Sequence, residues 1–356
     1  MLRGVPLPAL PALALALHGA GCAPDPSYLG KDPPGTSTTT TSTTGAGGSG
    51  GDSAGAGGAG GGDPVEPPGP TKLTVLNGIN DHQAIRLCFL PYPDGDGAGV
   101  SPWPAGASAL GFARGAAISP IDAVIPPGAD ARPHVIAGDL GATAGLDCAE
   151  LLALAEGGQG PVVAAALPVL PAQLFEAERS LLLVPVGCLG GPGHTDPAEE
   201  TGCGKGYTAE TPTVSLVAAP MSRLTETGKV ALQIAHASVA TPEVDVRVTT
   251  GTDPGSEWQV APELSLGAIG PFPPFVTLSA AQYGVLADAQ IRTYAPGTMN
   301  ATSTVPMSEV LARSDVSATD FTDGHGFALV AVGAAPGTGA GPFWHALTYA
   351  LVPADP

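Results

Sequence analysis

The feature that most restricts the fold of this chain is an internal similarity between two distant segments. In a single register, Leu-Thr-Val at 73–75 lies on Leu-Gln-Ile at 232–234, and Glu-Leu-Leu-Ala at 150–153 lies on Glu-Val-Leu-Ala at 309–312. One register that holds at both ends of a span of about 80 residues indicates a tandem duplication. We therefore expect two copies of one folded unit.

The patterns within each copy are typical of β-strands. Residues 230–234 and 244–248 alternate apolar and polar side chains, as half-buried strands do, and Gly and Pro separate such runs. The region from residue 72 to the end is about 285 residues long, which suits two domains. We therefore predict an all-β fold of two tandem antiparallel β-sandwich (immunoglobulin-like) domains, residues 72–226 and 227–356.

Each copy is expected to contain one short helix. Asp147 and Glu150 have the spacing of a capping box, which predicts a helix that begins there and ends before Gly157. The register of the duplication predicts its partner near residues 308–313.

The segment before residue 72 is predicted to lie outside the folded domains. Arg3 precedes an apolar run that is too short to span a bilayer, which indicates a cleaved export signal at residues 1–21. Residues 22–71 are rich in Thr, Gly and Pro and offer almost nothing to a core, so they are expected to form a disordered tether. O-linked glycans on the Thr run are the alternative role for this segment.

The end of the predicted signal resembles the lipobox of bacterial lipoproteins. Gly-Ala-Gly at 19–21 precedes Cys22, which in such proteins becomes the lipidated first residue of the mature chain. The resemblance implies a lipid anchor in a membrane. Ala23 is not the Asp that marks inner-membrane retention, so the resemblance favours the outer membrane, on its periplasmic or cell-surface side. A plain secretory signal without lipid is the alternative.

The second copy is similar to a known family of secreted domains. Ala-His-Ala-Ser around His236, Val-Asp-Val around Asp245 and the apolar run at 328–333 resemble the domain-of-unknown-function 4397 family of β-sandwich domains. The first copy has Asn77 and Arg86 at the positions of this His and this Asp. The resemblance implies a secreted β-sandwich and supplies no catalytic residues.

The charge of the chain excludes one large class of partners. The sequence has 32 acidic and 13 basic residues and a net charge of -19, which argues against nucleic acid and against an anionic membrane face as binding partners. It has no Gly-rich phosphate loop, dinucleotide fingerprint or His-Glu-x-x-His motif, so no cofactor is expected. Trp103, Trp258 and Trp344 could line a glycan site, but packing in the core or at its edge is the interpretation we prefer.

Four cysteines remain after Cys22, and all of them lie in the first copy. An even number in an exported chain indicates two disulfides, for which three connectivities are possible. Cys188 and Cys203 bracket a loop that the second copy lacks at this length, so we pair them, and Cys88 is left to pair with Cys148. A metal site is the alternative, but the chain has no Cys-x-x-Cys spacing.

Three acidic segments are candidate ligand sites. Asp94 and Asp96 stand at alternate positions before Gly, like the start of a calcium loop, but the later ligands are missing and an ordinary turn is preferred. Segment 194–200, with one His and two Glu, is expected to be a solvated loop. Segment 320–325, which ends in a His, is expected to be a turn with caps.

His236 and Asp245 are the candidate binding residues of the second copy. Together with Ser238 they suggest a Ser-His-Asp hydrolase. However, two residues that lie two apart on one strand do not bring a nucleophile to its base, and the chain has no Gly-x-Ser-x-Gly elbow. We therefore interpret His236 as a histidine that hydrogen-bonds a neighbouring turn and fixes the edge of the sandwich.

These patterns together predict a non-enzymatic surface lipoprotein that binds a protein or glycan partner. Two alternatives belong to other classes. One is a hydrolase that acts on envelope polymers, which would bring at least one His and two acids from distant segments into one site. The other is a calcium-dependent adhesion module.

Overall fold

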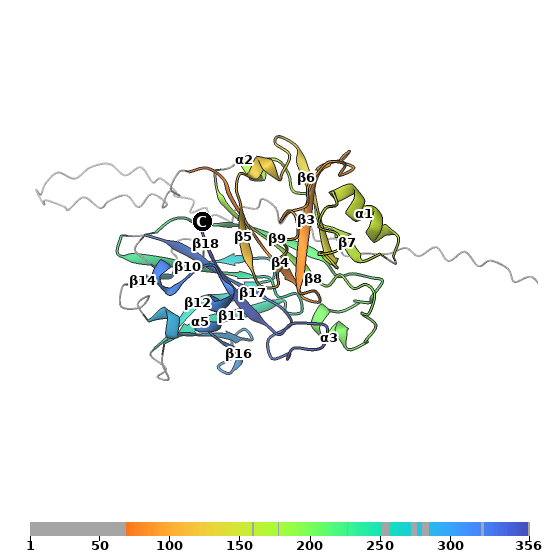
Figure 1. Cartoon of the computed structure of the whole chain (residues 1–356). Helices are drawn as coiled ribbons and strands as arrows, with labels where there is room; N and C mark the ends of the chain where they lie inside the picture. Colours follow the sequence, from red (N-terminus) through yellow and green to blue (C-terminus); the bar gives the residue numbers. More distant parts are fainter. Residues whose placement is uncertain are drawn as a thin grey trace, which may run out of the picture. The chain divides into compact units, whose positions relative to one another are not determined.

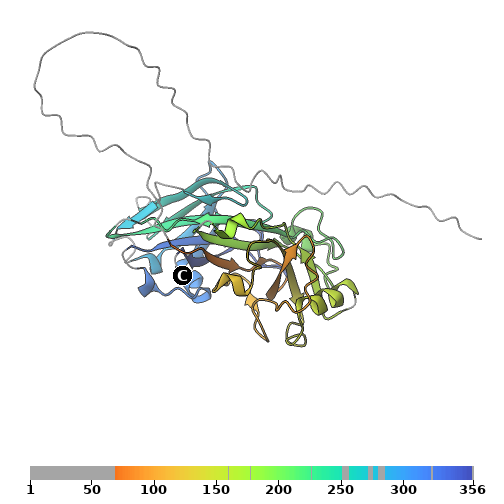
Figure 2. The same ribbon diagram turned by 90° about the horizontal axis from the view of Figure 1, so that it is seen from above.

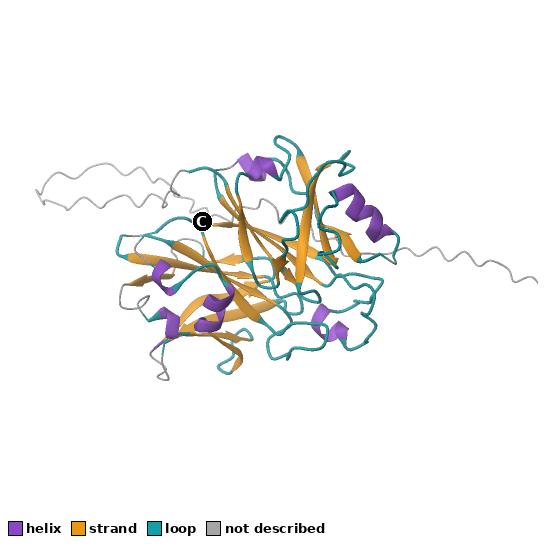
Figure 3. Cartoon of the chain, viewed as in Figure 1, coloured by secondary structure: helices purple, strands orange, loops and turns teal. Residues whose placement is uncertain are grey.

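The computed structural model describes residues 69–354 of the chain, except residues 159, 177, 226, 251–255, 272–275, 280–284 and 322–323. The predicted export signal, Cys22 and nearly all of the predicted tether lie outside the described residues. Strands form most of the regular structure, and the short helices lie around them (Figure 3). The part of the chain that is described contains no helix that is long and apolar enough to cross a membrane.

The described strands form four sheets, two in each half of the chain (Figure 1). The first inner sheet consists of β1 (Lys72–Leu76), β2 (Gly78–Ile79), β5 (Gly115–Ile118), β8 (Ser180–Gly187) and β9 (Ser215–Met221). The first outer sheet consists of β3 (Ala84–Tyr92), β4 (Leu110–Gly111), β6 (Asp130–Gly138) and β7 (Val162–Ala166).

The second half repeats this division into an inner and an outer sheet. The second inner sheet consists of β10 (Lys229–His236), β13 (Ile269–Gly270), β14 (Val276–Ser279), β17 (Gly326–Val332) and β18 (Thr348–Pro353). The second outer sheet consists of β11 (Glu243–Thr249), β12 (Glu257–Ser265), β15 (Gln290–Tyr294) and β16 (Ala301–Pro306). The strands up to β9 therefore pair only with one another, and the strands from β10 onward pair only with one another.

The helices are short. Within the described residues the α-helices are α1 (Cys148–Glu156), α2 (Gln173–Glu176), α3 (Glu199–Cys203) and α5 (Met307–Arg313), and the 3-10 turns are η2 (Ile121–Ala123), η4 (Leu286–Asp288) and η5 (Ala318–Asp320). Both predicted helices are confirmed, and α1 begins at the expected capping box between Asp147 and Glu150. The expectation of one helix in each half is wrong for the first half, since α2 and α3 also lie there.

The fold is mostly β with several antiparallel sheets, as predicted, but each of the two inner sheets also contains a parallel pairing that the prediction of antiparallel sandwiches did not include. β1 pairs in parallel with β8, and β10 pairs in parallel with β17. Both β8 and β17 are buried at every residue. A strand covered on both faces needs a nearly continuous apolar run, which explains the sequences Leu-Leu-Leu-Val in β8 and Leu-Val-Ala-Val in β17.

The first inner sheet packs against other sheets on both of its faces. Leu181 and Leu183 of β8 meet Phe89 of the first outer sheet, whereas Leu182 and Val184 meet the second inner sheet. Successive side chains of a strand point to opposite faces, so one strand supplies both cores. The two halves therefore share a core between their inner sheets, and their strands lie next to each other when viewed from above (Figure 2).

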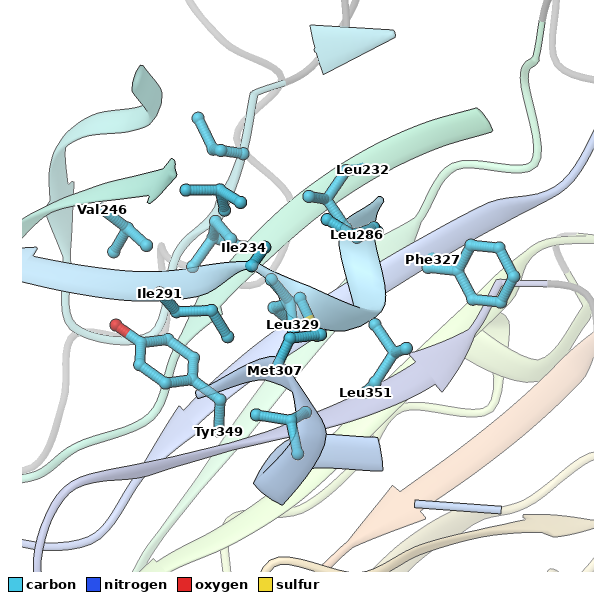
Figure 4. Packing of buried hydrophobic residues seen from close by; sticks show 14 of the residues in the cluster. Leu232, Ile234, Val246, Leu286, Ile291, Met307, Phe327, Leu329, Tyr349 and Leu351 are labelled. Carbon is cyan, nitrogen blue, oxygen red and sulfur yellow. The ribbon is translucent and has the colours of Figure 1, made fainter. Parts of the chain in front are cut away.

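The core of the second half lies between its inner and outer sheets. Figure 4 shows Leu232, Leu329 and Leu351 of the inner sheet near Ile291 and Val246 of the outer sheet. The same cluster contains Tyr349, Met307 and Leu286, so α5 and η4 close the core where the strands end. Burial of this apolar area is the main source of stability for the layer.

The two halves have the same order of strand pairing in their inner sheets. A first strand (β1 or β10) pairs in parallel with a later one (β8 or β17), which then pairs antiparallel with the last strand of the half (β9 or β18). The outer sheets differ at one edge. The edge strand β7 follows α1, whereas the edge strand β16 precedes α5. An alignment of the two halves that places α1 on α5 therefore cannot also place β7 on β16.

Candidate functional site

A cluster of ionisable side chains lies in the first half, beyond the ends of β2 and β8. Asp81 and His82 follow β2, whereas His194, Glu199 and Tyr207 belong to the loop between β8 and β9. The parallel pairing of β2 with β8 brings these segments together, because Ile79 lies opposite Gly187 and both chains leave the sheet at the same edge. We call these five residues the His–carboxylate cluster.

Asp81 lies at the centre of the cluster. Its Oδ1 accepts a hydrogen bond from the backbone N–H of Leu189 at 3.0 Å, and its Oδ2 accepts one from Gly190 at 2.7 Å. Its side chain is fully buried, and Oδ2 lies 3.8 Å from His82 Nε2 and 3.9 Å from His194 Nδ1. The carboxylate therefore faces both imidazole rings while the backbone of the following loop fixes its position.

Glu199 is the second buried carboxylate of the cluster. Its Oε2 accepts hydrogen bonds from His194 Nδ1 at 3.0 Å and from the Tyr207 hydroxyl at 2.9 Å, and its Oε1 accepts one from the N–H of Asp196 at 3.2 Å. The Tyr207 hydroxyl also lies 3.4 Å from Oδ2 of Asp81, so it connects the two carboxylates. Burial and the two nearby carboxylates raise the pKa of Tyr207 well above its ordinary value, so this hydroxyl stays protonated.

The two histidines reach the edge of the cluster. Their ring centroids are 5.0 Å apart, and 15% of the His82 side chain and 10% of the His194 side chain are exposed to solvent. His82 Nε2 donates to the carbonyl of Gly190 at 3.0 Å. Burial lowers the pKa of His82, more than the nearby Asp81 raises it. The imidazoles are therefore the part of the cluster that a ligand from solvent can reach.

A disulfide holds the loop that carries half of the cluster. Cys188 and Cys203 lie at disulfide distance, with their sulfurs 2.01 Å apart, and the residues between them include His194 and Glu199. Cys88 and Cys148 form the other pair, at 2.06 Å. Both pairs are the ones predicted from the sequence.

Residues of the second half also support the cluster. Asn80, which precedes Asp81, accepts a hydrogen bond from the N–H of His345 through its Oδ1 at 3.0 Å and donates from Nδ2 to the carbonyl of Gly202 in α3 at 2.7 Å. The ring of Phe343 lies 5.2 Å from that of His194. The cluster is therefore built at a place where loops from both halves meet.

The acidic segment at 194–200 corrects a prediction. It was expected to be a solvated loop, but the His194 side chain is nearly buried and that of Glu199 is fully buried. The rest of the segment is more exposed, as Asp196 and Glu200 show. The composition of the segment is that of a surface loop, and contacts with Asp81, Tyr207 and Phe343 bury part of it.

Asp94 and Asp96 lie in an exposed turn after β3. Oδ1 of Asp96 accepts a hydrogen bond from the N–H of Ala98 at 3.0 Å, as in an ordinary Asp-rich turn. Within the described residues, the groups of three or more possible metal ligands include neither of these two aspartates.

His236, Ser238 and Asp245 are close in sequence, but each side chain bonds to a different backbone group. His236 Nε2 donates to the carbonyl of Thr241 at 3.0 Å, which is the turn contact that we expected for this residue. The Ser238 hydroxyl bonds the carbonyls of Gly333 and Ala334. Asp245 accepts from the N–H groups of Glu263 at 2.7 Å and Gly297 at 3.3 Å. In the described part of the chain these three side chains form no hydrogen-bonded Ser-His-Asp chain.

The segment at 320–325 is described only in part. Asp320 and Ser317 form a capping box at the N-terminal end of η5, as a turn with caps would. His325 is exposed and lies before β17. Asp323 lies outside the described residues.

Asp81 and His82 were not among the residues predicted from the sequence. They follow a short strand, and neither stands in a motif. Their partners stand far along the chain, in the loop that begins after Gly187, and only the parallel pairing of β2 with β8 shows that the two segments meet. The one available signal was indirect, since the loop that follows β8 is the long loop that the second half lacks.

Comparison with known proteins gives no relative from which a function could be transferred. No protein-family model matches the sequence, and no curated protein matches it.

Proposed function

We propose that this protein is an exported, lipid-anchored module of the cell envelope, built from two immunoglobulin-like β-sandwiches, and that it binds a ligand and catalyses no reaction. The sequence at the N-terminus supports export and lipidation at Cys22. The two cysteine pairs support an oxidising compartment, since disulfides persist outside the cytosol.

The observation that carries a binding role is the His–carboxylate cluster. Two histidines and two carboxylates come from two segments that are far apart in the sequence, and the loop that carries His194 and Glu199 is fixed by a disulfide. Such a rigid set of polar groups at the end of a sheet, with two side chains that reach solvent, is typical of a ligand site on a β scaffold. We therefore place the binding site of this module at the cluster.

A hydrolase acting on envelope polymers is the second candidate. The cluster brings two histidines and two acids into one place, which is the arrangement that the hydrolase hypothesis requires. However, the described contacts of the cluster include no serine or free thiol nucleophile, because Cys188 and Cys203 are bonded to each other. We therefore favour binding, and release of soluble fragments from purified envelope polymers by the wild-type protein but not by a His194→Gln variant would overturn this choice.

Two experiments test the proposed function. Envelope fractionation should find the wild-type chain in the outer-membrane fraction and a Cys22→Ser variant in the soluble exported fraction; an identical distribution of the two contradicts the lipid anchor. A thermal-shift screen with metals, glycans and peptidoglycan fragments should find a ligand that stabilises the wild type and not a His194→Gln variant. If every shift is the same for both proteins, the cluster is not the binding site.

A further inference from the structure

The His–carboxylate cluster places two buried carboxylates beside two imidazole rings. The carboxylates of Asp81 and Glu199 are fully buried, and the ion-pair partners that they have within the described residues are histidines. A buried anion is costly unless a positive charge compensates it. Oδ2 of Asp81 faces ring nitrogens of both histidines at 3.8 and 3.9 Å, and Oε2 of Glu199 faces Nδ1 of His194 at 3.0 Å. A cation bound where the histidines meet solvent would therefore compensate these carboxylates.

The ligand atoms of the cluster are spaced for a single ion. One carboxylate oxygen of Asp81 and one ring nitrogen each of His82 and His194 lie within 4.8 Å of one another. Ligands of one ion at about 2.0–2.2 Å from the metal lie roughly 3–4 Å apart. The distances of 3.8 and 3.9 Å from Asp81 Oδ2 to the two rings fall in this range.

The ring nitrogens that face Asp81 are already held in position. Nε2 of His82 donates to the carbonyl of Gly190, and Nδ1 of His194 donates to Oε2 of Glu199. An imidazole nitrogen that binds a metal must give up its proton, so an ion would take the place of the protons that these two contacts now share. Glu199 Oε2, which the Tyr207 hydroxyl fixes, would then lie beside the ion.

We propose that Asp81, His82 and His194 bind one divalent transition-metal ion of the zinc class, and that Glu199 lies beside it and supplies the second negative charge. Two imidazoles and one carboxylate suit Zn²⁺, whereas Ca²⁺ and Mg²⁺ prefer oxygen ligands alone. Three protein ligands leave a position for Glu199, for water or for a group from a partner. This inference rests on the proposed function, because it names the ligand class of the same site.

The test is a metal titration of the full chain, purified from the envelope in detergent without a polyhistidine tag and stripped with EDTA. We expect calorimetry to give one Zn²⁺ per chain and Co²⁺ to produce visible absorption bands, while Ca²⁺ does not compete. The variants Asp81→Asn, His82→Gln and His194→Gln should each lose at least roughly tenfold in affinity, and Glu199→Gln should lose roughly 10–100-fold. His325→Gln changes an exposed histidine of the second half and should bind like the wild type.

Circular dichroism and melting curves in EDTA establish that each variant is folded. If a variant does not fold, Zn²⁺ binding at the cluster is tested on the wild type by chemical protection. Zn²⁺ should protect His82 and His194, but not His325, from modification by diethyl pyrocarbonate, as read by mass spectrometry. Equal modification of His82 and His194 with and without Zn²⁺ overturns the proposal, as does unchanged affinity in the folded His82→Gln and His194→Gln variants.

The outcomes also separate the two proposals. If the wild type binds no Zn²⁺ but another ligand of the thermal-shift screen still requires His194, the metal inference falls and the proposed function stands. If no ligand and no ion depends on His194, both fall.

Discussion

Asn77 and His236, which stand at equivalent positions in the register of the predicted duplication, make similar pairs of hydrogen bonds in the two halves of the chain. Each side chain accepts a bond from the N–H two residues later, Ile79 for Asn77 at 2.9 Å and Ser238 for His236 at 3.4 Å. Each also donates to a backbone carbonyl, that of Leu110 in β4 for Asn77 and that of Thr241 in the turn before β11 for His236. An amide and a neutral imidazole are thus interchangeable here, which leads to a prediction about pH.

The stability of the protein should depend on His236 between pH 6.5 and pH 4. Burial lowers the pKa of His236 from 6.5 to about 4, so in this window the unfolded chain binds a proton that the folded chain does not. The contribution of the neutral ring is complete above pH 6.5 and decreases as the pH falls, by about 3 kcal/mol at most. Urea unfolding at a series of pH values measures this loss.

His236→Asn is the matched control, because it introduces the residue that the first half uses at the same position. Its stability should fall less steeply than that of the wild type between pH 6.5 and pH 4. Parallel pH profiles for the two proteins would show that His236 does not titrate as its burial requires.

Arg86 should stabilise the folded protein through its hydrogen bonds to the loop that follows β6. Its side chain is completely buried and donates to the carbonyls of Ser108 at 2.9 Å and Leu140 at 2.8 Å. Arg86→Met should therefore cost about 1–3 kcal/mol, because buried carbonyls lose their partners. Arg114→Met, at an exposed arginine, should stay within about 0.5 kcal/mol of the wild type. Denaturant unfolding compares them, and equal losses would argue against this role of Arg86.

Gly202 in α3 leaves space for Trp344 of the second half. A Cβ at this position would overlap with Cγ of the indole, so Gly202→Ala requires α3 or the Trp344 side chain to move. We expect a loss of about 1–3 kcal/mol in the free energy of unfolding. Gly145→Ala is the control, since its Cβ would meet no atom within 4 Å. Trp fluorescence during unfolding gives the readout, and a neutral Gly202→Ala variant would contradict the tight contact.

Removal of the Cys188–Cys203 pair should affect the site more than the fold. The closed loop of 15 residues contributes about 3 kcal/mol in the chain-entropy estimate, less than the roughly 4 kcal/mol expected for the 60-residue loop of Cys88–Cys148. The Cys188→Ser/Cys203→Ser variant should nevertheless lose Zn²⁺ affinity, because it frees His194 and Glu199. The Cys88→Ser/Cys148→Ser variant should be less stable but keep its affinity for the metal while folded. If the Cys88→Ser/Cys148→Ser variant lost Zn²⁺ affinity and the Cys188→Ser/Cys203→Ser variant kept it, the metal ligands would not be those of the His–carboxylate cluster.

The sequence was a good guide to local structure and a poor guide to long-range pairing. The capping box at Asp147 and both cysteine pairs could be predicted, because spacing and local chemistry decide them. The parallel pairing of β1 with β8 could not, since a long stretch of chain separates two strands whose apolar pattern fits either direction. The cluster was missed for the same reason, because Asp81 and Glu199 meet only through the parallel pairing of β2 with β8.

The equal pairing order of β8–β9 and β17–β18 has a practical consequence for protein engineering. Each of these strand pairs presents two fixed ends, Gly187 and Ser215 in the first half and Val332 and Thr348 in the second. The loop of the first half carries His194 and Glu199, whereas in the register of the predicted duplication Ala240 of the second half corresponds to Asp81. The loop between β8 and β9 could therefore be transplanted between β17 and β18, together with the Asp81–His82 pair after β10. The engineered chain would then carry the same cluster in both halves.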